Sequence, residues 1–197
     1  MQRLVMFVLT MLLAGCSLPL SPPPADVTHT LTLAPDTPVP TARLPGVSLQ
    51  VAAPGAAPGY ATSAMAYRKS PHELLYYARH RWVDRPARFI GQALEDGLSA
   101  AGVSVLAEGA GARPDYRLLS ELLQLDQDFT QRPSQVRLAV RLQLVDVRQA
   151  RVLGSHTVRL EQSTASDDPV GGVVAANALL AKLVAEAVSF CVRLTAE

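Results

Sequence analysis

This sequence lacks an excess of either positive or negative charge. Its 197 residues hold 18 Lys and Arg against 17 Asp and Glu, and the chain has neither a basic stripe nor an acidic tail. Binding to nucleic acid depends on clustered Lys and Arg side chains that neutralise phosphates. The composition therefore excludes nucleic acid as a partner. The length suits one domain, and a hydrophobic fraction of 49% is enough to build its core.

Cysteine is almost absent, since the chain has only Cys16 and Cys191. If Cys16 carries a modification, as argued below, Cys191 has no partner within the chain, and a disulfide framework is excluded. Cys191 lies in an apolar helical pattern near the C-terminus, where a cysteine usually behaves as a small buried hydrophobe. An intermolecular disulfide or a reactive thiol is the alternative.

Catalytic and metal-binding patterns are missing too. The four histidines do not have the spacing of zinc ligands, and the sequence has no G-x-S-x-G nucleophile elbow. Gly171 and Gly172 lack the lysine and serine of a phosphate-binding loop, so we interpret them as the start of a helix. Glu121, Asp126 and Asp128 include a candidate acid–base pair, but solvated strand and loop residues are the simpler interpretation. We expect no enzymatic activity, no cofactor and no metal site.

The N-terminal apolar run is too short to cross a membrane. Residues 4–13 are apolar apart from one threonine, whereas a membrane-spanning helix needs about 20 such residues. Arg3 precedes the run and small residues follow it, which is typical of a secretory signal peptide. We therefore predict a signal peptide over residues 1–15.

The end of this run, Leu13-Ala14-Gly15-Cys16, resembles the lipobox of bacterial lipoproteins. The resemblance implies cleavage between Gly15 and Cys16, followed by acylation of Cys16. More than one acyl chain is needed for stable anchoring, at about 0.8 kcal/mol per buried methylene. An ordinary signal peptide with a chance cysteine is the alternative. Ser17 stands where Asp would imply retention in the inner membrane, so similarity to enterobacterial lipoproteins implies the outer membrane, with the body facing the periplasm.

Prolines separate this anchor from the folded body. The stretch "SLPLSPPPAD" favours an extended, polyproline-like tether, because proline fixes φ and has no N–H to donate. We assign residues 16–26 to the lipidated cysteine and tether, and residues 27–197 to a single domain.

The first half of the domain predicts short strands and one helix. Leu31 and Leu33 alternate with threonines from Val27 onward, residues 47–51 repeat the pattern, and another short strand ends near Tyr67. "PGAAPG" predicts a loop. A helix is expected with Asp84 as its N-cap and Gly102 just past its end, followed by a strand at "VSVLAE". Its apolar residues recur at helical spacing: Ile90, Ala93, Leu94, Gly97, Leu98 and Ala101.

The second half predicts three long strands and a final helix. The apolar stretch 113–129 is followed by 134–148, whose residues alternate between an apolar and a polar face, and by 150–163. Short links between them suggest antiparallel hairpins. Asp167, Asp168 and Pro169 start a helix that runs to about Leu194. The predicted fold is α+β, a two-layer sandwich in which a mixed, largely antiparallel sheet carries two long helices on one face and leaves a polar face uncovered.

An aromatic and basic cluster lies just before the first predicted helix. Tyr76, Tyr77 and Trp82 occur there with Arg81 and further cations. Because Trp, Tyr and Arg are enriched at interface hot spots, we predict that Tyr76, Tyr77, Arg81 and Trp82 bind a partner. The alternative is structural, with Trp82 and one tyrosine seating the helix on the sheet.

Three stretches together resemble the auxiliary lipoproteins of ABC-type transport systems, including the Pqi-type lipoproteins that accompany MCE-domain proteins. They are "AYRKSPHELLYYARHRWVDRPARFIGQALEDGL", "LLQLDQDFTQRPSQVRLAVRLQLVD" and "DDPVGGVVAANALLAKL". The resemblance implies a non-enzymatic outer-membrane component that docks an MCE-domain periplasmic protein of a lipid transporter with an ABC permease and ATPase. The first strand, "HTLTLA", lacks the tyrosine often found there in the family. Open sheet edges favour a homo-oligomer. A carrier of lipid or another hydrophobic ligand is the alternative, and it requires an apolar cavity between helices and sheet.

Overall fold

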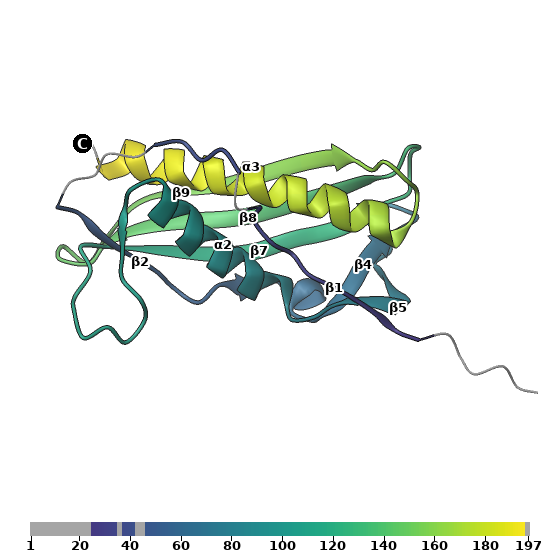
Figure 1. Cartoon of the computed structure of the whole chain (residues 1–197), viewed down its shortest axis with the longest axis horizontal. Coiled ribbons are helices and arrows are strands. Elements are labelled where there is room, and N and C mark those ends of the chain that lie inside the picture. The colour runs from purple at the N-terminus through teal and green to yellow at the C-terminus, as the bar shows by residue number, and fades with distance from the viewer. Residues whose placement is uncertain (1–24, 35–36, 42–45, 196–197) are drawn as a thin grey trace, which may run out of the picture.

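The computed structural model describes residues 25–34, 37–41 and 46–195. In this part of the chain, nine strands form one mixed sheet, and helices α2 (Pro86–Ala100) and α3 (Pro169–Thr195) lie on one of its faces (Figure 1). The predicted α+β sandwich, with two long helices on one face, is confirmed.

Three long antiparallel strands make the larger part of the sheet. They are β7 (Tyr116–Asp128), β8 (Gln135–Asp146) and β9 (Arg151–Ser163), joined in sequence by hairpins as predicted. The apolar face of β8 is at most 3% exposed, because α3 packs over it. That face consists of Val136, Leu138, Val140, Leu142 and Leu144.

Short strands complete the sheet along the other side of β7. Three of them pair with β7 in parallel, one after another along its length, and this makes the sheet mixed. They are β2 (Ser48–Val51), β3 (Gly55–Ala56) and β4 (Ala64–Arg68), with the 3-10 helix η1 (Pro58–Tyr60) between the last two. The sheet continues from β2 to β6 (Ser104–Val105), and from β4 through β5 (Leu75–Trp82) to β1 (Val27–His29) at the edge.

Three details of the first half differ from expectation. The two-residue strand β3 lies within the predicted loop, and β5 was not expected, because its sequence mixes apolar and basic residues without alternation. The first strand ends at His29, before the alternating leucines. Leu31 is nevertheless only 3% exposed. The alternation of leucine and threonine therefore reflects burial of one side of an extended segment, not pairing of that segment in the sheet.

The start of α2 also corrects the prediction. Arg85, not Asp84, is the N-cap, with φ −62° and ψ 130°, because Pro86 disfavours helical geometry at the residue before it. The Asp84 carboxylate instead accepts a hydrogen bond from the Arg85 backbone N–H (2.6 Å) and pairs with Arg88 (2.8 Å). Gly102, at φ 92°, follows the helix end as predicted.

Helix α3 is the central core helix. It is long and apolar enough to cross a membrane by length and composition, but its apolar residues pack against β8, β9 and α2. It begins as predicted, where the Gly171 N–H donates to Asp168 Oδ1 (2.8 Å). Seven of its hydrophobic residues are at most 1% exposed: Leu179, Leu180, Leu183, Val184, Ala187, Val188 and Cys191. The predicted burial of Cys191 is confirmed.

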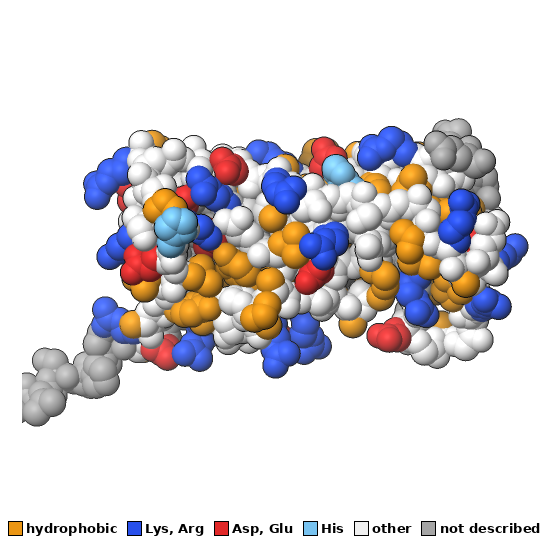
Figure 2. Space-filling model, turned by 180° about the vertical axis from the view of Figure 1, so that it is seen from behind, with side chains coloured by type: hydrophobic (Ala, Val, Ile, Leu, Met, Phe, Trp, Pro, Cys, Tyr) orange, Lys and Arg blue, Asp and Glu red, His pale blue; other side chains and the backbone are white. Residues whose placement is uncertain are grey.

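The face opposite the helices is mixed rather than polar. Seen from that side, orange hydrophobic side chains lie in patches between blue Lys and Arg and red Asp and Glu side chains (Figure 2). Leu119 and Leu123 are only half-buried, whereas Ala139, on the same face of β8 as Arg137, is 6% exposed. Ion pairs that bridge neighbouring strands cover part of this face, which strict alternation of apolar and polar residues did not foresee.

Candidate functional site

The predicted anchor residues Gly15, Cys16 and Ser17 lie outside the described residues. The described chain starts at Ala25 and enters the sheet with β1, which pairs in parallel with β5. The segment that would connect an anchor to the body therefore arrives at the sheet edge beside β5.

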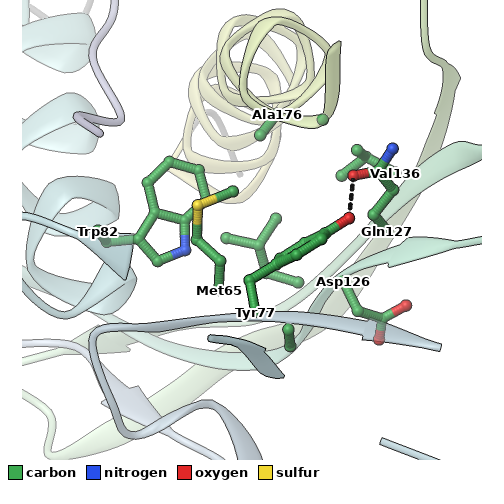
Figure 3. Close-up of a pocket in the computed structure, with 10 residues that line it drawn as sticks. Met65, Tyr77, Trp82, Asp126, Gln127, Val136 and Ala176 are labelled. Carbon is green, nitrogen blue, oxygen red and sulfur yellow. Dashed lines mark hydrogen bonds between the residues drawn. The ribbon is translucent and has the colours of Figure 1, made fainter. Parts of the chain in front are cut away.

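The predicted partner-binding cluster divides between the inside and the outside of the molecule. Trp82 is 4% exposed, and the Tyr77 hydroxyl donates a hydrogen bond to Gln127 Oε1 (2.8 Å) beneath α3 (Figure 3). Trp82 is therefore part of the core, whereas Tyr77 is half-buried and packs against it. Burial raises the pKa of Tyr77 well above its usual value. Tyr76, 43% exposed, and Arg81 remain on the surface.

A small cavity lies between α3 and the sheet at this point. Its volume is about 20 Å³, which is room for about one water molecule. Its walls are mostly apolar: Met65, Ala66, Tyr77, Trp82, Leu125, Val136, Gly172 and Ala176, with Asp126 and Gln127 as polar members. Sites that enclose small ligands usually measure about 300 Å³ or more. This cavity does not accommodate an acyl chain.

A chain of buried polar groups leads from the cavity to the start of α3. Gln127, 3% exposed, accepts from Tyr77 and donates through Nε2 to Ser134 Oγ (2.9 Å). Ser134 Oγ lies 2.8 Å from Thr164 Oγ1, and the Ser134 backbone N–H donates to Asp167 (2.7 Å). These contacts join β5, β7, the start of β8 and the segment before α3. The cluster therefore stabilises the packing around the start of the helix.

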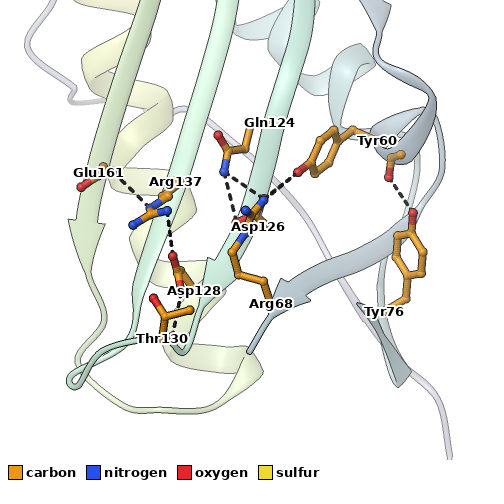
Figure 4. Close-up of polar contacts among 10 residues, drawn as sticks. Tyr60, Arg68, Tyr76, Gln124, Asp126, Asp128, Thr130, Arg137 and Glu161 are labelled. Atoms are coloured by element: carbon orange, nitrogen blue, oxygen red, sulfur yellow. Dashed lines mark hydrogen bonds and ion pairs between the residues drawn. The ribbon is translucent and has the colours of Figure 1, made fainter. Parts of the chain in front are cut away.

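The acidic residues considered as an acid–base group are each tied to an arginine. Asp126, whose side chain is fully buried, accepts from Arg68 Nη2 (2.7 Å) and Nε (3.0 Å), and also from the Tyr60 hydroxyl (2.6 Å) (Figure 4). Burial and this hydrogen bond raise the pKa of Tyr60 well above its usual value. Arg68 and Tyr60 thus occupy both carboxylate oxygens of Asp126, which is buried beneath them.

The other two acids are paired in the same way. Asp128, also without side-chain exposure, lies 2.8 Å from Arg137 Nη1, and Glu121 lies 2.8 Å from Arg141. Arg137 also reaches Glu161 on β9 (3.2 Å), so the pairs cross-link the three long strands (Figure 4). The sequence interpretation as solvated residues is wrong for Asp126 and Asp128, because arginines fold over them and exclude water.

Two histidines meet at the sheet edge. His29 Nε2 on β1 lies 3.0 Å from His80 Nδ1 on β5, within hydrogen-bond distance. Burial and the nearby His80 lower the pKa of His29. Among the described residues, no group of three or more His, Cys, Asp or Glu side chains is placed to hold a metal ion. The His29–His80 contact links β1 to β5, where the two strands pair in parallel.

Comparison with known proteins gives a family and a fold. Residues 29–188 match the family described as ABC-type transport auxiliary lipoprotein component. The solved structure of protein XCC0632 from Xanthomonas campestris is similar, with a TM-score of 0.70 and 20% identity over 86% of this chain and 94% of that one. Protein CT253 from Chlamydia trachomatis has a TM-score of 0.55 at 10% identity, over 76% and 97%. At these identities the likeness shows a shared fold. A search of curated proteins finds no match.

Proposed function

The chain belongs to the family of ABC-type transport auxiliary lipoprotein components, and we propose that it is the docking component of a lipid transporter. The observation that carries this proposal is the family match, which covers residues 29–188 and therefore nearly all of the sheet and both helices. In this proposal an MCE-domain periplasmic protein binds the described body, and an ABC permease and ATPase in the inner membrane belong to the same system.

We further propose that Cys16 anchors the body to the outer membrane on its periplasmic face. The support comes from the sequence: cleavage between Gly15 and Cys16 leaves an acylated cysteine, and Ser17 favours outer-membrane sorting. Residues 1–15 are then removed, residues 16–26 form the tether, and residues 27–197 form the domain. Two or more acyl chains hold such a protein stably.

The described residues support a binding role rather than catalysis. The acidic candidates are engaged by arginines, and the cavity under α3 has room for about one water. A lipid carrier would need an enclosed apolar space many times larger. Two larger hollows near Tyr116 and Asp146, of about 260 and 310 Å³, have mainly polar linings, so the docking function is favoured over the carrier. The long edge strand β9 pairs only with β8 among the described strands, and such an edge favours association with a second copy.

The proposal is tested in membranes from cells that produce the full chain. Crosslinking and purification should recover an MCE-domain protein with this chain, and mass spectrometry of the mature N-terminus should find Cys16 carrying acyl chains. Recovery of no MCE or ABC component under conditions that capture other envelope complexes would refute the docking role. A mature N-terminus that lacks acyl chains would refute the anchor separately.

A further inference from the structure

We propose that the sheet edge beside β1 rests on an anionic phospholipid surface and thereby orients the anchored body. The contact surface consists of Lys69 in the β4–β5 turn, Arg79 and Arg81 on β5, and Arg85 at the start of α2, and we call it the basic edge. The inference rests on the proposed anchor at Cys16. It gives a role to the exposed part of the aromatic and basic cluster, which the docking proposal leaves without one.

The charge of this region departs from that of the whole chain. Residues 67–88 contain six Lys or Arg and only two acidic residues, in a protein whose net charge is +1. Two of the six are neutralised, Arg68 by Asp126 and Arg88 by Asp84.

The four cations of the basic edge are all exposed, and none of them enters an ion pair among the described residues. The acidic residues nearest to them in sequence are Glu73, in the same turn, and Asp84, which is paired with Arg88, while Asp26 precedes β1. The surface is therefore positive overall, and Lys and Arg close to an anionic bilayer are attracted to it.

Exposed apolar and aromatic side chains accompany these cations. Val83 is 59% exposed, Tyr76 43% and Val27 42%, and they lie on the turn into α2, on β5 and on β1. The Tyr76 hydroxyl donates to the Gly59 carbonyl (2.8 Å), which holds the ring in place at the surface (Figure 4). Tyrosine is enriched at membrane–water interfaces because its ring is apolar and its end polar. A surface that mixes cations with such side chains favours contact with lipid headgroups over full exposure to water.

The path of the chain brings this edge to the bilayer. In the parallel pairing of β1 with β5, Val27 lies opposite His80 and Thr28 opposite Arg81, so the chain enters the body beside the basic edge. The ten residues from Cys16 to Ala25 are joined by nine steps and reach at most about 30 Å when fully extended. Acyl chains at Cys16 therefore keep the basic edge close to the headgroups.

The rest of the molecule then extends away from the bilayer. Strands β7 and β9 are 13 residues long and extend about 43 Å. The basic edge and the point where the described chain begins lie toward one end of these strands (Figure 1). Contact of this edge with the bilayer leaves the other end, with the β8–β9 turn and the end of α3, projecting into the periplasm.

The test uses the acylated mature protein reconstituted into vesicles that contain a lipid with a nitroxide on its headgroup. Trp82 is the only tryptophan of the chain and follows Arg81 directly, so its fluorescence reports on this edge. Quenching should be stronger in phosphatidylcholine vesicles that include phosphatidylglycerol than in phosphatidylcholine alone. High salt should abolish the difference, because it screens the attraction.

A matched pair of variants locates the effect. R79E/R81E/R85E should lose the difference between the two vesicle types. R151E/R159E/R193E makes the same change in net charge at exposed arginines of β9 and α3 that enter no ion pair among the described residues, and it should keep the difference. The comparison of the two vesicle types with the unaltered protein does not depend on either variant folding.

Several results would overturn the proposal. Equal quenching of acylated protein in both vesicle types would refute the lipid contact while leaving the anchor and the docking role intact. If R79E/R81E/R85E lost crosslinking to an MCE-domain protein but kept the vesicle response, the basic edge would be a protein-binding surface. If Cys16 were not acylated, the anchor would fail and this inference with it.

Discussion

At the scale of single residues, Gly172 shows how closely α3 approaches the sheet. A Cβ at this position would collide with Gln127 Oε1, the atom that accepts the Tyr77 hydrogen bond. The glycine therefore allows a buried hydrogen-bond chain to pass directly beneath the first turn of the helix. The sequence predicts Gly171 and Gly172 at a helix start, but nothing in it shows which side chains face them.

We predict that Gly172→Ala destabilises the protein. In an open helix position this change stabilises by roughly 1 kcal/mol, but here it displaces Gln127, and overpacking of this kind costs about 1–3 kcal/mol. Urea unfolding followed by circular dichroism measures the difference. Gly55→Ala is the control, since a Cβ there meets Glu121 Cγ at an ordinary 3.7 Å. A stabilised Gly172→Ala variant would contradict the tight contact.

Cys191 allows a second prediction at this scale. Its side chain is 0% exposed, and burial raises the pKa of its thiol to about 12. Because the thiolate is the reactive form, the native protein should resist alkylation by iodoacetamide at pH 8 and react fully once unfolded in urea. The adduct is counted by mass spectrometry, and fast labelling of the folded protein would contradict the burial.

At the scale of elements, residues 30–34 follow β1 and run across the helices (Figure 1). We call this segment the strap. Leu31 packs into the core, and the Thr32 N–H donates to Asn177 Oδ1 on α3 (2.7 Å). The Val83 N–H donates to the His29 carbonyl (2.8 Å), and His29 contacts His80. These contacts attach the segment nearest the proposed tether to both layers of the fold.

We predict that Asn177→Ala loosens this strap without unfolding the domain. The net contribution of one such hydrogen bond is about 0.5–1.5 kcal/mol, so amide exchange at Thr32 should accelerate about two- to tenfold. Asn177→Asp is the control, because it keeps an acceptor oxygen for the Thr32 N–H while it replaces the Nδ2 donor to the Val173 carbonyl by a charged oxygen. Unchanged exchange at Thr32 in Asn177→Ala would show that Leu31 alone holds the strap.

At the scale of the whole molecule, carboxylates bridge segments that are distant in sequence. Asp115 accepts from the Ser48 N–H (2.9 Å) and hydroxyl (2.8 Å) and pairs with Arg148. Asp168 accepts from the Gly171 N–H. Hydrogen bonds from these backbone and side-chain donors lower the pKa of both carboxyls.

These lowered pKa values predict sensitivity to acid. A carboxyl whose pKa is lower in the folded than in the unfolded state stabilises the fold above its unfolded pKa, which is about 3.9 for Asp. This contribution is lost as the pH falls further. The free energy of unfolding should therefore decrease from about pH 4 downward. Urea titrations between neutral and acidic pH measure it.

The acid prediction has a matched pair of variants. Asp115→Asn should be less stable than the unaltered protein at neutral pH and should lose less stability on acidification, because one of the titrating carboxylates is gone. Glu186→Gln, at an exposed position of α3 without an ion pair among the described residues, should follow the unaltered protein. Parallel curves for Asp115→Asn and the unaltered protein would exclude a role for this carboxyl.

The sequence by itself determined the elements with strong periodicity. The alternation in β8 and the helical spacing in α2 predicted the buried faces correctly, because core packing against a regular backbone imposes that period. The fold class and the family resemblance followed from these elements and from three long stretches. Strands β3 and β5 escaped prediction, because β3 has only two residues and β5, which lies between β4 and β1, has no alternating pattern of its own.

Only the tertiary structure decided which side chains are functional candidates. Tyr76 and Tyr77 are adjacent in the sequence, yet one is exposed and the other is hydrogen-bonded beneath α3. Asp126 is buried by Arg68, which is 58 residues away. The sequence lists charges and aromatic rings but not the partners that neutralise or cover them. Ion pairs between residues far apart in the chain neutralise some of the arginines. The four cations of the basic edge have no such partner among the described residues.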